Sequence, residues 1–379
     1  KSDYAIAYYN LGNILKALIE PQKAKECYEK AIQINPNYAA AHGNLGSIFK
    51  ELGGHQKAKE CYEKAIEIQP NHAKAHNSLG AVFKDLEETE KAKACYEKAI
   101  EIDPNHADAY SNLGVIFKEL GELQKAKSWY EKAIQINPNH AIAHNNLGIV
   151  FKDLRDLKKA RYYCEKAIQI NPSYVPAHIN LGVVLRGLGD HQKAKECYEK
   201  AIQINPSYAA AHNNLGTLQT HLGKFAEAMV AYRQAIKIKP DYAEVYSNLL
   251  LSLHYETNFD PNLYLSEAKK FRSNCKPKKK LSFHYQYDQD PKKLKIGFVS
   301  SDFGNHPGGF FSLSTLRELK KKNFDLIAYS NYDRKDKFAH NFKSLFLKWS
   351  SIEGKKDEIV VKQIVKDGIH ILIDSQGHS

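Results

Sequence analysis

The chain has 379 residues, 43% of them hydrophobic, which is enough for two or three domains with buried cores. It holds no run of about 18 uncharged apolar residues, and its first residues lack the pattern of a secretory signal, so we expect neither a membrane-spanning helix nor membrane binding. The net charge is +12, but Lys and Glu alternate in the repeated segment "KAKECYEKA" and the lysine runs lack interleaved aromatics, which argues against a nucleic-acid partner.

A repeat of 34 residues runs through residues 1–274, the first predicted domain. Prolines keep this step at positions 36, 70, 104, 138, 172, 206 and 240, and Leu-Gly pairs keep it too. The period resembles the tetratricopeptide repeat, a helix-turn-helix unit. In the second unit, apolar spacing predicts one helix over 39–52 and another that ends near Ile68. One hairpin cannot cover its own apolar face, so seven units and a degenerate eighth from Asp241 should stack into a superhelix with a concave groove.

Cysteine and histidine each recur at one position of the repeat. The cysteines are Cys27, Cys61, Cys95 and Cys197, and the histidines are His42, His76, His144, His178 and His212. Equivalent residues of stacked repeats lie on the order of 10 Å apart, too far for a disulfide bond or a shared zinc ion. We therefore interpret both rows as packing residues and expect no metal site. Unpaired cysteines favour a reducing compartment, here taken as the cytoplasm.

Asparagine precedes the Leu-Gly pair in nearly every repeat and forms a third row. Its members are Asn10, Asn44, Asn112, Asn146, Asn180, Asn214 and Asn248, and Ser78 is the one departure. Asparagine is a mediocre helix former that carries both a donor and an acceptor, so a row on the inner wall of the groove could hold the backbone of an extended peptide. The alternative is that each asparagine hydrogen-bonds the next repeat. The residues alone leave both open.

The pattern changes after the repeats. A polar, lysine-containing linker is predicted at 275–293, and from residue 294 to 379 short apolar runs alternate with helical segments. Strands are predicted at "KIGFVS", "FDLIAYSN" and "GIHILID", and helices at "FFSLSTLRELKKK", around 338–346 and around 357–366. This alternation indicates a parallel sheet with Rossmann-like winding, whose functional residues gather beyond the carboxyl ends of the strands.

The loop "SDFGNHPGG" follows the first of these strands and contains His306. Its glycines do not match the dinucleotide-binding fingerprint, and it lacks the Lys-Ser/Thr pair of a P-loop. A histidine at a strand exit could be a general base or could orient a phosphate, although a lone loop histidine is more often structural. The segment 329–331 and His378 are expected at the same edge of the sheet.

The asparagine row, "LKIGFVSSDFGNHP" and "DGIHILIDSQGHS" together resemble the O-linked N-acetylglucosamine (O-GlcNAc) transferase family, glycosyltransferase family 41, in its compact bacterial form. The resemblance implies inverting transfer of N-acetylglucosamine from UDP-N-acetylglucosamine to Ser or Thr hydroxyls of proteins, without a cofactor, the acceptor polypeptide lying in the repeat groove. It assigns His306 and His378 to the active site and the seven asparagines to peptide binding. It also implies a two-lobed GT-B catalytic region, of which 294–379 would be part of the N-terminal lobe, so the chain is expected to be an inactive fragment.

Some features depart from the family pattern. Val365 stands where other members have a second histidine, and an acidic row four residues before each asparagine is represented only by Asp108 and Glu244. The longer insert of animal members is missing. Two other functions stay open: a non-catalytic interaction scaffold, and a protein O-fucosyltransferase like the plant relatives. The sequence does not predict the acceptor proteins, the UDP contacts or the oligomeric state.

Overall fold

A computed structural model describes residues 2–255, 260–275, 293–304, 307–322, 324–332, 336–355 and 357–374. The chain divides into two compact units, Lys1–Lys276 and Pro277–Ser379. None of the helices in the described part has the length and hydropathy needed to span a bilayer.

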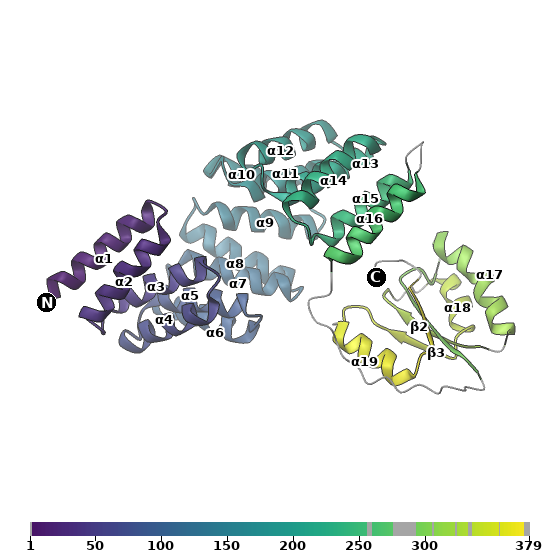
Figure 1. Ribbon diagram of the computed structural model, residues 1–379, viewed down its shortest axis with the longest axis horizontal. Coiled ribbons are helices and arrows are strands. Elements are labelled where there is room, and N and C mark those ends of the chain that lie inside the picture. Colours follow the sequence, from purple (N-terminus) through teal and green to yellow (C-terminus); the bar gives the residue numbers. More distant parts are fainter. Residues whose placement is uncertain are drawn as a thin grey trace. The chain divides into compact units, whose positions relative to one another are not determined.

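The described part of the first unit consists of helix pairs, as the repeat predicts (Figure 1). The first helices of the pairs are α1 (Ser2–Ala17), α3 (Ala39–Glu51), α5 (Ala73–Asp85), α7 (Ala107–Glu119), α9 (Ala141–Asp153), α11 (Val175–Gly187), α13 (Ala209–His221) and α15 (Ala243–His254). The second helices are α2 (Pro21–Ile34), α4 (His55–Ile68), α6 (Thr89–Ile102), α8 (Leu123–Ile136), α10 (Leu157–Ile170), α12 (His191–Ile204), α14 (Phe225–Ile238) and α16 (Pro261–Asn274). The predicted tetratricopeptide hairpins are thereby confirmed.

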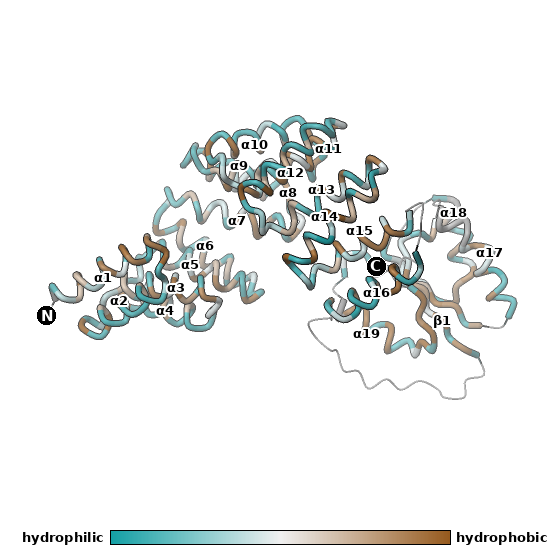
Figure 2. Tube along the Cα trace, turned by 45° about the horizontal axis from the view of Figure 1, so that its top comes forward, coloured by the Kyte–Doolittle hydropathy of each residue, from teal (hydrophilic) through white to brown (hydrophobic). Residues whose placement is uncertain are grey.

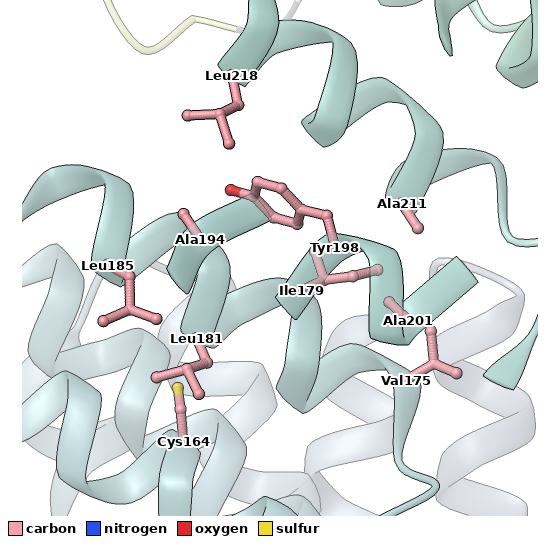
Figure 3. Packing of buried hydrophobic residues seen from close by; sticks show 10 residues of the cluster. All are labelled: Cys164, Val175, Ile179, Leu181, Leu185, Ala194, Tyr198, Ala201, Ala211 and Leu218. Carbon is pink, nitrogen blue, oxygen red and sulfur yellow. The ribbon is translucent and has the colours of Figure 1, made fainter. Parts of the chain in front are cut away.

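The glycine of each Leu-Gly pair allows the two helices of a hairpin to pack closely. A Cβ atom at Gly114 would lie 2.6 Å from Cε1 of Tyr130, and one at Gly182 would lie 2.5 Å from Cε1 of Tyr198. Both tyrosine rings are fully buried. Figure 3 shows Tyr198 surrounded by aliphatic side chains such as Ile179 and Leu218. Any residue larger than glycine would have to displace a core side chain, a tyrosine ring in most repeats and Cys164 at Gly148, which explains why Leu-Gly recurs.

The histidine row ties each repeat to the end of the preceding one. In each case Nε2 of the histidine lies 2.8–3.0 Å from the carbonyl oxygen of the proline six residues earlier, in the pairs His42–Pro36, His76–Pro70, His144–Pro138, His178–Pro172 and His212–Pro206. The ring N–H donates to this carbonyl. These histidines are therefore specific hydrogen-bond donors at the repeat junctions, a role that the packing interpretation did not include.

The cysteine row packs as predicted. Cys27 is buried, and Cys61, Cys95 and Cys197 lie against hydrophobic clusters of their repeats. All six cysteines of the chain are free. Burial raises the pKa of Cys61, Cys95 and Cys197 to about 11. These thiols are thus protonated packing groups.

The second unit contains a parallel sheet in the strand order β3-β2-β1-β4. Its described strands are β1 (Lys295–Ser300), β2 (Asp325–Ser330), β3 (Lys348–Ser351) and β4 (Ile371–Asp374). Phe298 of β1 lies opposite Ala328 of β2 and Ile373 of β4. Hydrophobic residues are concentrated along β1, which Figure 2 shows in brown. The parallel α/β class predicted for this segment is confirmed.

Helices cover both faces of this sheet (Figure 1). On one face, α17 (Pro307–Lys321) and α18 (Lys337–Lys343) contribute Leu316 and Phe342 to a cluster with Phe298. On the other, α19 (Asp357–Asp367) contributes Val360 and Ile364 to a separate cluster. The alternation of side chains along β1 and β2 thus feeds two small cores.

Strand β3 was not predicted, and the expectation of three strands was wrong by one. Its sequence, "KWSS", lacks the apolar run that marked the other strands, and β3 lies at the edge of the sheet with its residues exposed or half-buried. Hydrogen bonds beside the strand hold it, such as the one from the Ile352 N–H to the Ser330 carbonyl at 2.8 Å. Periodicity is a weak signal for such an edge strand.

Candidate functional site

Four asparagines of the row donate to an asparagine of the preceding repeat. The bonds run from Nδ2 to Oδ1 in the pairs Asn44–Asn13 (2.8 Å), Asn112–Asn77 (2.9 Å), Asn180–Asn145 (2.9 Å) and Asn248–Asn213 (3.1 Å). All four donors are half-buried on first helices. The alternative of a bond between repeats therefore holds for these members.

Asn146 and Asn214 behave differently because of what the preceding repeat offers. The residue 35 positions earlier is Ser111 for Asn146 and Ile179 for Asn214. Asn214 donates instead to the Ala210 carbonyl of its own helix at 2.8 Å, and Oδ1 of Asn146 accepts from Asn145 at 3.3 Å. Asn10 is exposed on α1. The row is thus uniform in position but not in bonding.

The partner asparagines were not predicted as functional residues. Asn77, Asn145 and Asn213 stand directly before the row position, and each bond spans 35 residues rather than the 34 of the repeat. The doubled asparagine in "HNNLG" was the available signal. The bond spans one residue more than the repeat because the acceptor stands one position before the row position.

A cavity of about 150 Å³ opens beside the first members of the row. Tyr9, Lys16, Asn44, Ser47 and Lys74 contribute to its wall. These side chains come from the first helices α1, α3 and α5. Asn44 therefore borders a hollow of the repeat surface, where a ligand group could reach its amide.

The two acidic residues four positions before the row also bind neighbouring repeats. Oδ1 of Asp108 lies 2.9 Å from Nε2 of His140, and this hydrogen bond is the main cause that lowers the pKa of Asp108. Oε1 of Glu244 accepts from Nδ2 of Asn213 at 3.3 Å. Both carboxylates thereby take part in junctions between repeats.

The carboxyl edge of the sheet is where its winding changes direction. The chain adds β2 and β3 on one side of β1 and then places β4 on the other, so the crevice expected in such sheets lies beyond Ser300 and Asp374. His306 follows β1 by six residues and His378 follows β4 by four, and both lie outside the described residues. Tyr329 and Ser330 are buried in β2. The next residue, Asn331, donates its backbone N–H to the carbonyl oxygen of Ser300 at the end of β1.

The loop that leaves β1 is anchored by Phe303. This residue is buried, with its ring 5.7 Å from that of Phe342 and 5.2 Å from those of Phe346 and Trp349. Oγ of Ser300 accepts the backbone N–H of Asp302 at 3.0 Å. The segment between Ser300 and Gly304 thus has a fixed path at the carboxyl edge of the sheet.

No group of three or more His, Cys, Asp and Glu side chains in the described part of the chain is arranged to hold a metal ion. The described geometry offers two candidate surfaces, the asparagine row and the carboxyl edge of the sheet.

Family models match both units. Tetratricopeptide-repeat models match residues 3–71, 37–105, 139–207 and 173–241, and a further one matches 107–140. The model of glycosyl transferase family 41 matches residues 270–379.

Curated relatives come from plants. The chain is 34% identical over 139 residues to "Probable UDP-N-acetylglucosamine--peptide N-acetylglucosaminyltransferase SPINDLY" of Oryza sativa subsp. japonica, which covers 34% of the chain and 15% of the relative. It is 33% identical over 96 residues to the protein of the same name from Arabidopsis thaliana, which covers 24% of the chain and 10% of the relative. The chain thus matches only a small part of the length of these relatives.

A solved structure, the APC/C hetero-tetramer Cut9-Hcn1, aligns with a TM-score of 0.57 at 16% identity, covering 66% of this chain and 53% of that one. This likeness shows the fold alone. With the family models, the resemblance stated from the sequence motifs is confirmed at the level of family. The chain belongs to the tetratricopeptide-repeat proteins, and its residues 270–379 form a segment of glycosyl transferase family 41, the O-GlcNAc transferase family.

Proposed function

We propose that this chain belongs to a protein O-N-acetylglucosaminyltransferase that transfers N-acetylglucosamine from UDP-N-acetylglucosamine to Ser or Thr hydroxyls with inversion. The observation that carries this proposal is the union, in one chain, of a tetratricopeptide array with a glycosyl transferase family 41 segment. The names of the plant relatives, which describe a UDP-N-acetylglucosamine–peptide transferase, support the choice of donor and acceptor.

The division of labour follows the proposed domains. Residues 1–274 bind the acceptor polypeptide, 275–293 link the two parts, and 294–379 contribute to the N-terminal lobe of the catalytic region.

The asparagine row is proposed to hold the acceptor backbone. A side-chain amide has two N–H groups and a carbonyl with two lone pairs, so one bond to the neighbouring repeat leaves a donor and an acceptor. In the pair of Asn180 and Asn145, the existing bond fixes the amide of Asn180 before any peptide binds. A preoriented amide loses less conformational freedom on binding. The bond between repeats and the peptide clamp are therefore compatible.

His306 and His378 are proposed as the active-site histidines. His306 would act as general base toward the acceptor hydroxyl or would position the substrate, since both residues follow strands that end at the carboxyl edge of the sheet. Inversion requires the acceptor oxygen to attack the anomeric carbon as UDP leaves from the opposite side, so the hydroxyl proton must pass to a base.

The proposal is tested by transfer assays on the chain together with whatever its gene encodes beyond Ser379. UDP-N-acetylglucosamine and GDP-fucose are offered in parallel with Ser-containing peptides. His306→Ala should lower transfer by at least about tenfold and leave peptide affinity unchanged. His340→Ala, at an exposed histidine on α18, is the matched control. Unchanged transfer in His306→Ala removes that residue from the mechanism, and fucose as the only sugar transferred overturns the proposed donor.

A further inference from the structure

A row of ion pairs joins successive repeats near the ends of their first helices. The Nζ atoms of the lysines lie 3.0–3.3 Å from a carboxylate 35 residues later, in the pairs Lys16–Glu51, Lys50–Asp85 and Lys84–Glu119. On the second helix of its hairpin, His55 also lies 3.8 Å from Asp85. At these junctions, each cation of the row is balanced by an acid of the next repeat.

The row breaks farther along the array. The position that carries the acid is occupied by Gly187 at the end of α11 and by His221 at the end of α13. Lys152, which would pair at position 187, lies 3.2 Å from Asp153 of its own helix instead. Arg186, which would pair at position 221, has its Nη1 atom buried without a hydrogen-bond partner among the described residues. A buried guanidinium N–H without an acceptor is unfavourable, so this junction lacks an anion.

A pocket of about 620 Å³ opens at the break. Its wall includes Lys152, Arg155, Arg186, His191 and His221. We call these five residues the cationic notch. Asp153 is the acid in the same wall, and it already pairs with Lys152. Even with both histidines neutral, three permanent cations therefore face one carboxylate.

The equivalent site four repeats earlier contains an acidic residue that the notch does not have. There Lys50 and His55 both approach Asp85. In the notch, Arg186 and His191 occupy those two positions, and His221 replaces the acid. The change converts a neutral junction into a positively charged one.

The hydrophobic core of the repeat lies next to Arg186, because the preceding residue, Leu185, is buried in that core. Tyr198 on α12 is fully buried, and its hydroxyl is a second polar group without a partner among the described residues. Burial raises the pKa of Tyr198 to about 12, and the nearby Arg186 charge acts in the opposite direction. Figure 3 shows Ala194 and Leu218 near the ring of Tyr198, and Leu185 belongs to the same cluster. Arg186 is thus held beside a packed surface.

We propose that the cationic notch binds a carboxylate or phosphate group carried by an acidic segment of a polypeptide partner. The planar fork of a guanidinium matches both oxyanions, and such charge-assisted bonds are strong where water is excluded. A nucleic acid would need a run of phosphate contacts, whereas the three junctions named above already neutralise their lysines. The inference requires that the repeats bind polypeptides and is independent of sugar transfer.

The test is fluorescence anisotropy of labelled peptides with the whole chain. A Gly/Ser peptide of about twelve residues carries four central glutamates, and its analogues carry glutamines or one phosphoserine. The glutamate and phosphoserine peptides should bind at least about tenfold more tightly than the glutamine peptide, since one lost charge-assisted bond accounts for such a factor. Arg186→Gln should remove this preference. Lys50→Gln, at the equivalent position whose cation is already paired, should leave the preference unchanged.

Two further variants restore the row of acids instead of deleting a cation. His221→Asp supplies the partner for Arg186, and Gly187→Glu supplies that for Lys152. A Cβ atom at Gly187 would lie 3.4 Å from Cδ1 of Leu157, an ordinary contact, so the side chain can be accommodated. Both variants should fold, which circular dichroism would verify. Their affinity for the glutamate and phosphoserine peptides should be about tenfold lower than that of the wild type.

Equal affinity for the glutamate and glutamine peptides overturns the proposal. So does a preference for acidic peptides that survives in both His221→Asp and Gly187→Glu. Inorganic phosphate could bind to the wild type and not to His221→Asp, while neither chain binds an acidic peptide. In that case the occupant is a free anion and the polypeptide proposal fails. Tighter binding of single-stranded DNA than of any peptide, lost in Arg186→Gln, would assign the notch to nucleic acid instead.

Discussion

Nε2 of His140 lies 2.9 Å from Oδ1 of Asp108, and this hydrogen bond joins α7 to the residue that caps α9. Nδ1 of the same ring accepts the backbone N–H of Ala143 at 3.1 Å, so Nε2 carries the proton and the imidazole donates to the carboxylate. His140 is buried, whereas the Asp108 side chain is 66% exposed. Asp108 can therefore stabilise the junction while its carboxylate stays exposed to solvent.

Asp108→Asn should lower the free energy of unfolding by about 1 kcal/mol or less at neutral pH, because the carboxylate is largely exposed. The lowered pKa of Asp108 means that its contribution is present above the pKa of the unfolded chain and disappears as the pH falls through the folded value. Urea denaturation at pH 7 and pH 3 measures this, with Glu26→Gln at an exposed acid of α2 as the control. An Asp108→Asn effect of equal size at both pH values would contradict it.

Asn180 and Asn214 separate the two roles of the asparagine row. Asn180→Ala removes the bond to Asn145 and should lower the free energy of unfolding by about 1 kcal/mol. Asn214→Ala removes only a hydrogen bond to its own helix and should lower the free energy of unfolding by less than Asn180→Ala does. If the row holds the peptide backbone, both variants weaken the affinity for an extended acceptor peptide to a similar degree. If Asn214→Ala does not change the dissociation constant of the acceptor peptide, the row has a purely structural role.

The repeat allowed much of the first unit to be predicted. The predicted helix over 39–52 corresponds to α3 (Ala39–Glu51), and the predicted end near Ile68 corresponds to the last residue of α4. The same apolar spacing and turn residues recur in each unit, so local signals were sufficient. The bond between Asn112 and Asn77 was not predictable in this way, because it depends on how one repeat rotates against the next.

In the second unit, apolar content decided which strands could be predicted, since β4 is an exposed edge strand and was still predicted from its apolar run. β1 and β2 are buried beyond their first residue and therefore carry apolar runs, whereas β3 is an edge strand with Trp349 as its single large apolar residue. The anchoring of the loop by Phe303 also escaped prediction, since its partner rings lie 39 to 46 residues away in sequence. His306 and His378 stay predictions, because both lie outside the described residues.

Gly114 and Gly43 lie in equivalent first helices but face different surroundings. A Cβ atom at Gly114 would lie 2.6 Å from the ring of Tyr130, whereas one at Gly43 would have no atom within 4 Å. Gly114→Ala should therefore destabilise the array by about 1–3 kcal/mol through overpacking. Gly43→Ala should stabilise it by about 0.5–1 kcal/mol, since alanine restricts the unfolded chain. Thermal denaturation of the two variants measures these shifts, and shifts of the same sign would refute the packing argument.

His144 should make the stability of the array depend on pH. Its Nε2 donates to the Pro138 carbonyl at 3.0 Å and its Nδ1 is buried, and burial lowers its pKa, with smaller contributions from Lys166 and His140. Because the folded pKa lies below that of the unfolded chain, protonation favours unfolding as the pH falls below about 6.5. His144→Gln should reduce the loss of melting temperature between pH 7.5 and pH 5.5. His212→Gln, which removes the same hydrogen bond at a more exposed site, serves as the control.

Asp367 links three elements of the α/β unit. Its carboxylate accepts from Nζ of Lys348 at 2.5 Å, from the Tyr329 hydroxyl at 2.8 Å and from Nε2 of Gln363 at 3.1 Å, and its side chain is 8% exposed. Burial acts to raise the pKa of Asp367, but these three hydrogen bonds outweigh burial and lower it. The stabilisation is therefore present above the pKa of the unfolded chain, about 3.9, and is lost as the pH falls through the folded value.

Asp367→Asn should lower the stability of this unit by about 1–3 kcal/mol at pH 7, because it weakens charge-assisted bonds and leaves the Lys348 cation unbalanced. The difference from the wild type should shrink as the pH falls below the pKa of the unfolded chain, and should vanish once the pH lies below the lowered folded pKa of Asp367. Fluorescence of Trp349 in a Trp129→Phe background follows the α/β unit within the whole chain, because the sequence has two tryptophans. Asp325→Asn, at the start of β2, is the control. A difference that does not shrink as the pH is lowered would mean that the shape of the Asp367 side chain, and not its charge, holds α19 to the sheet.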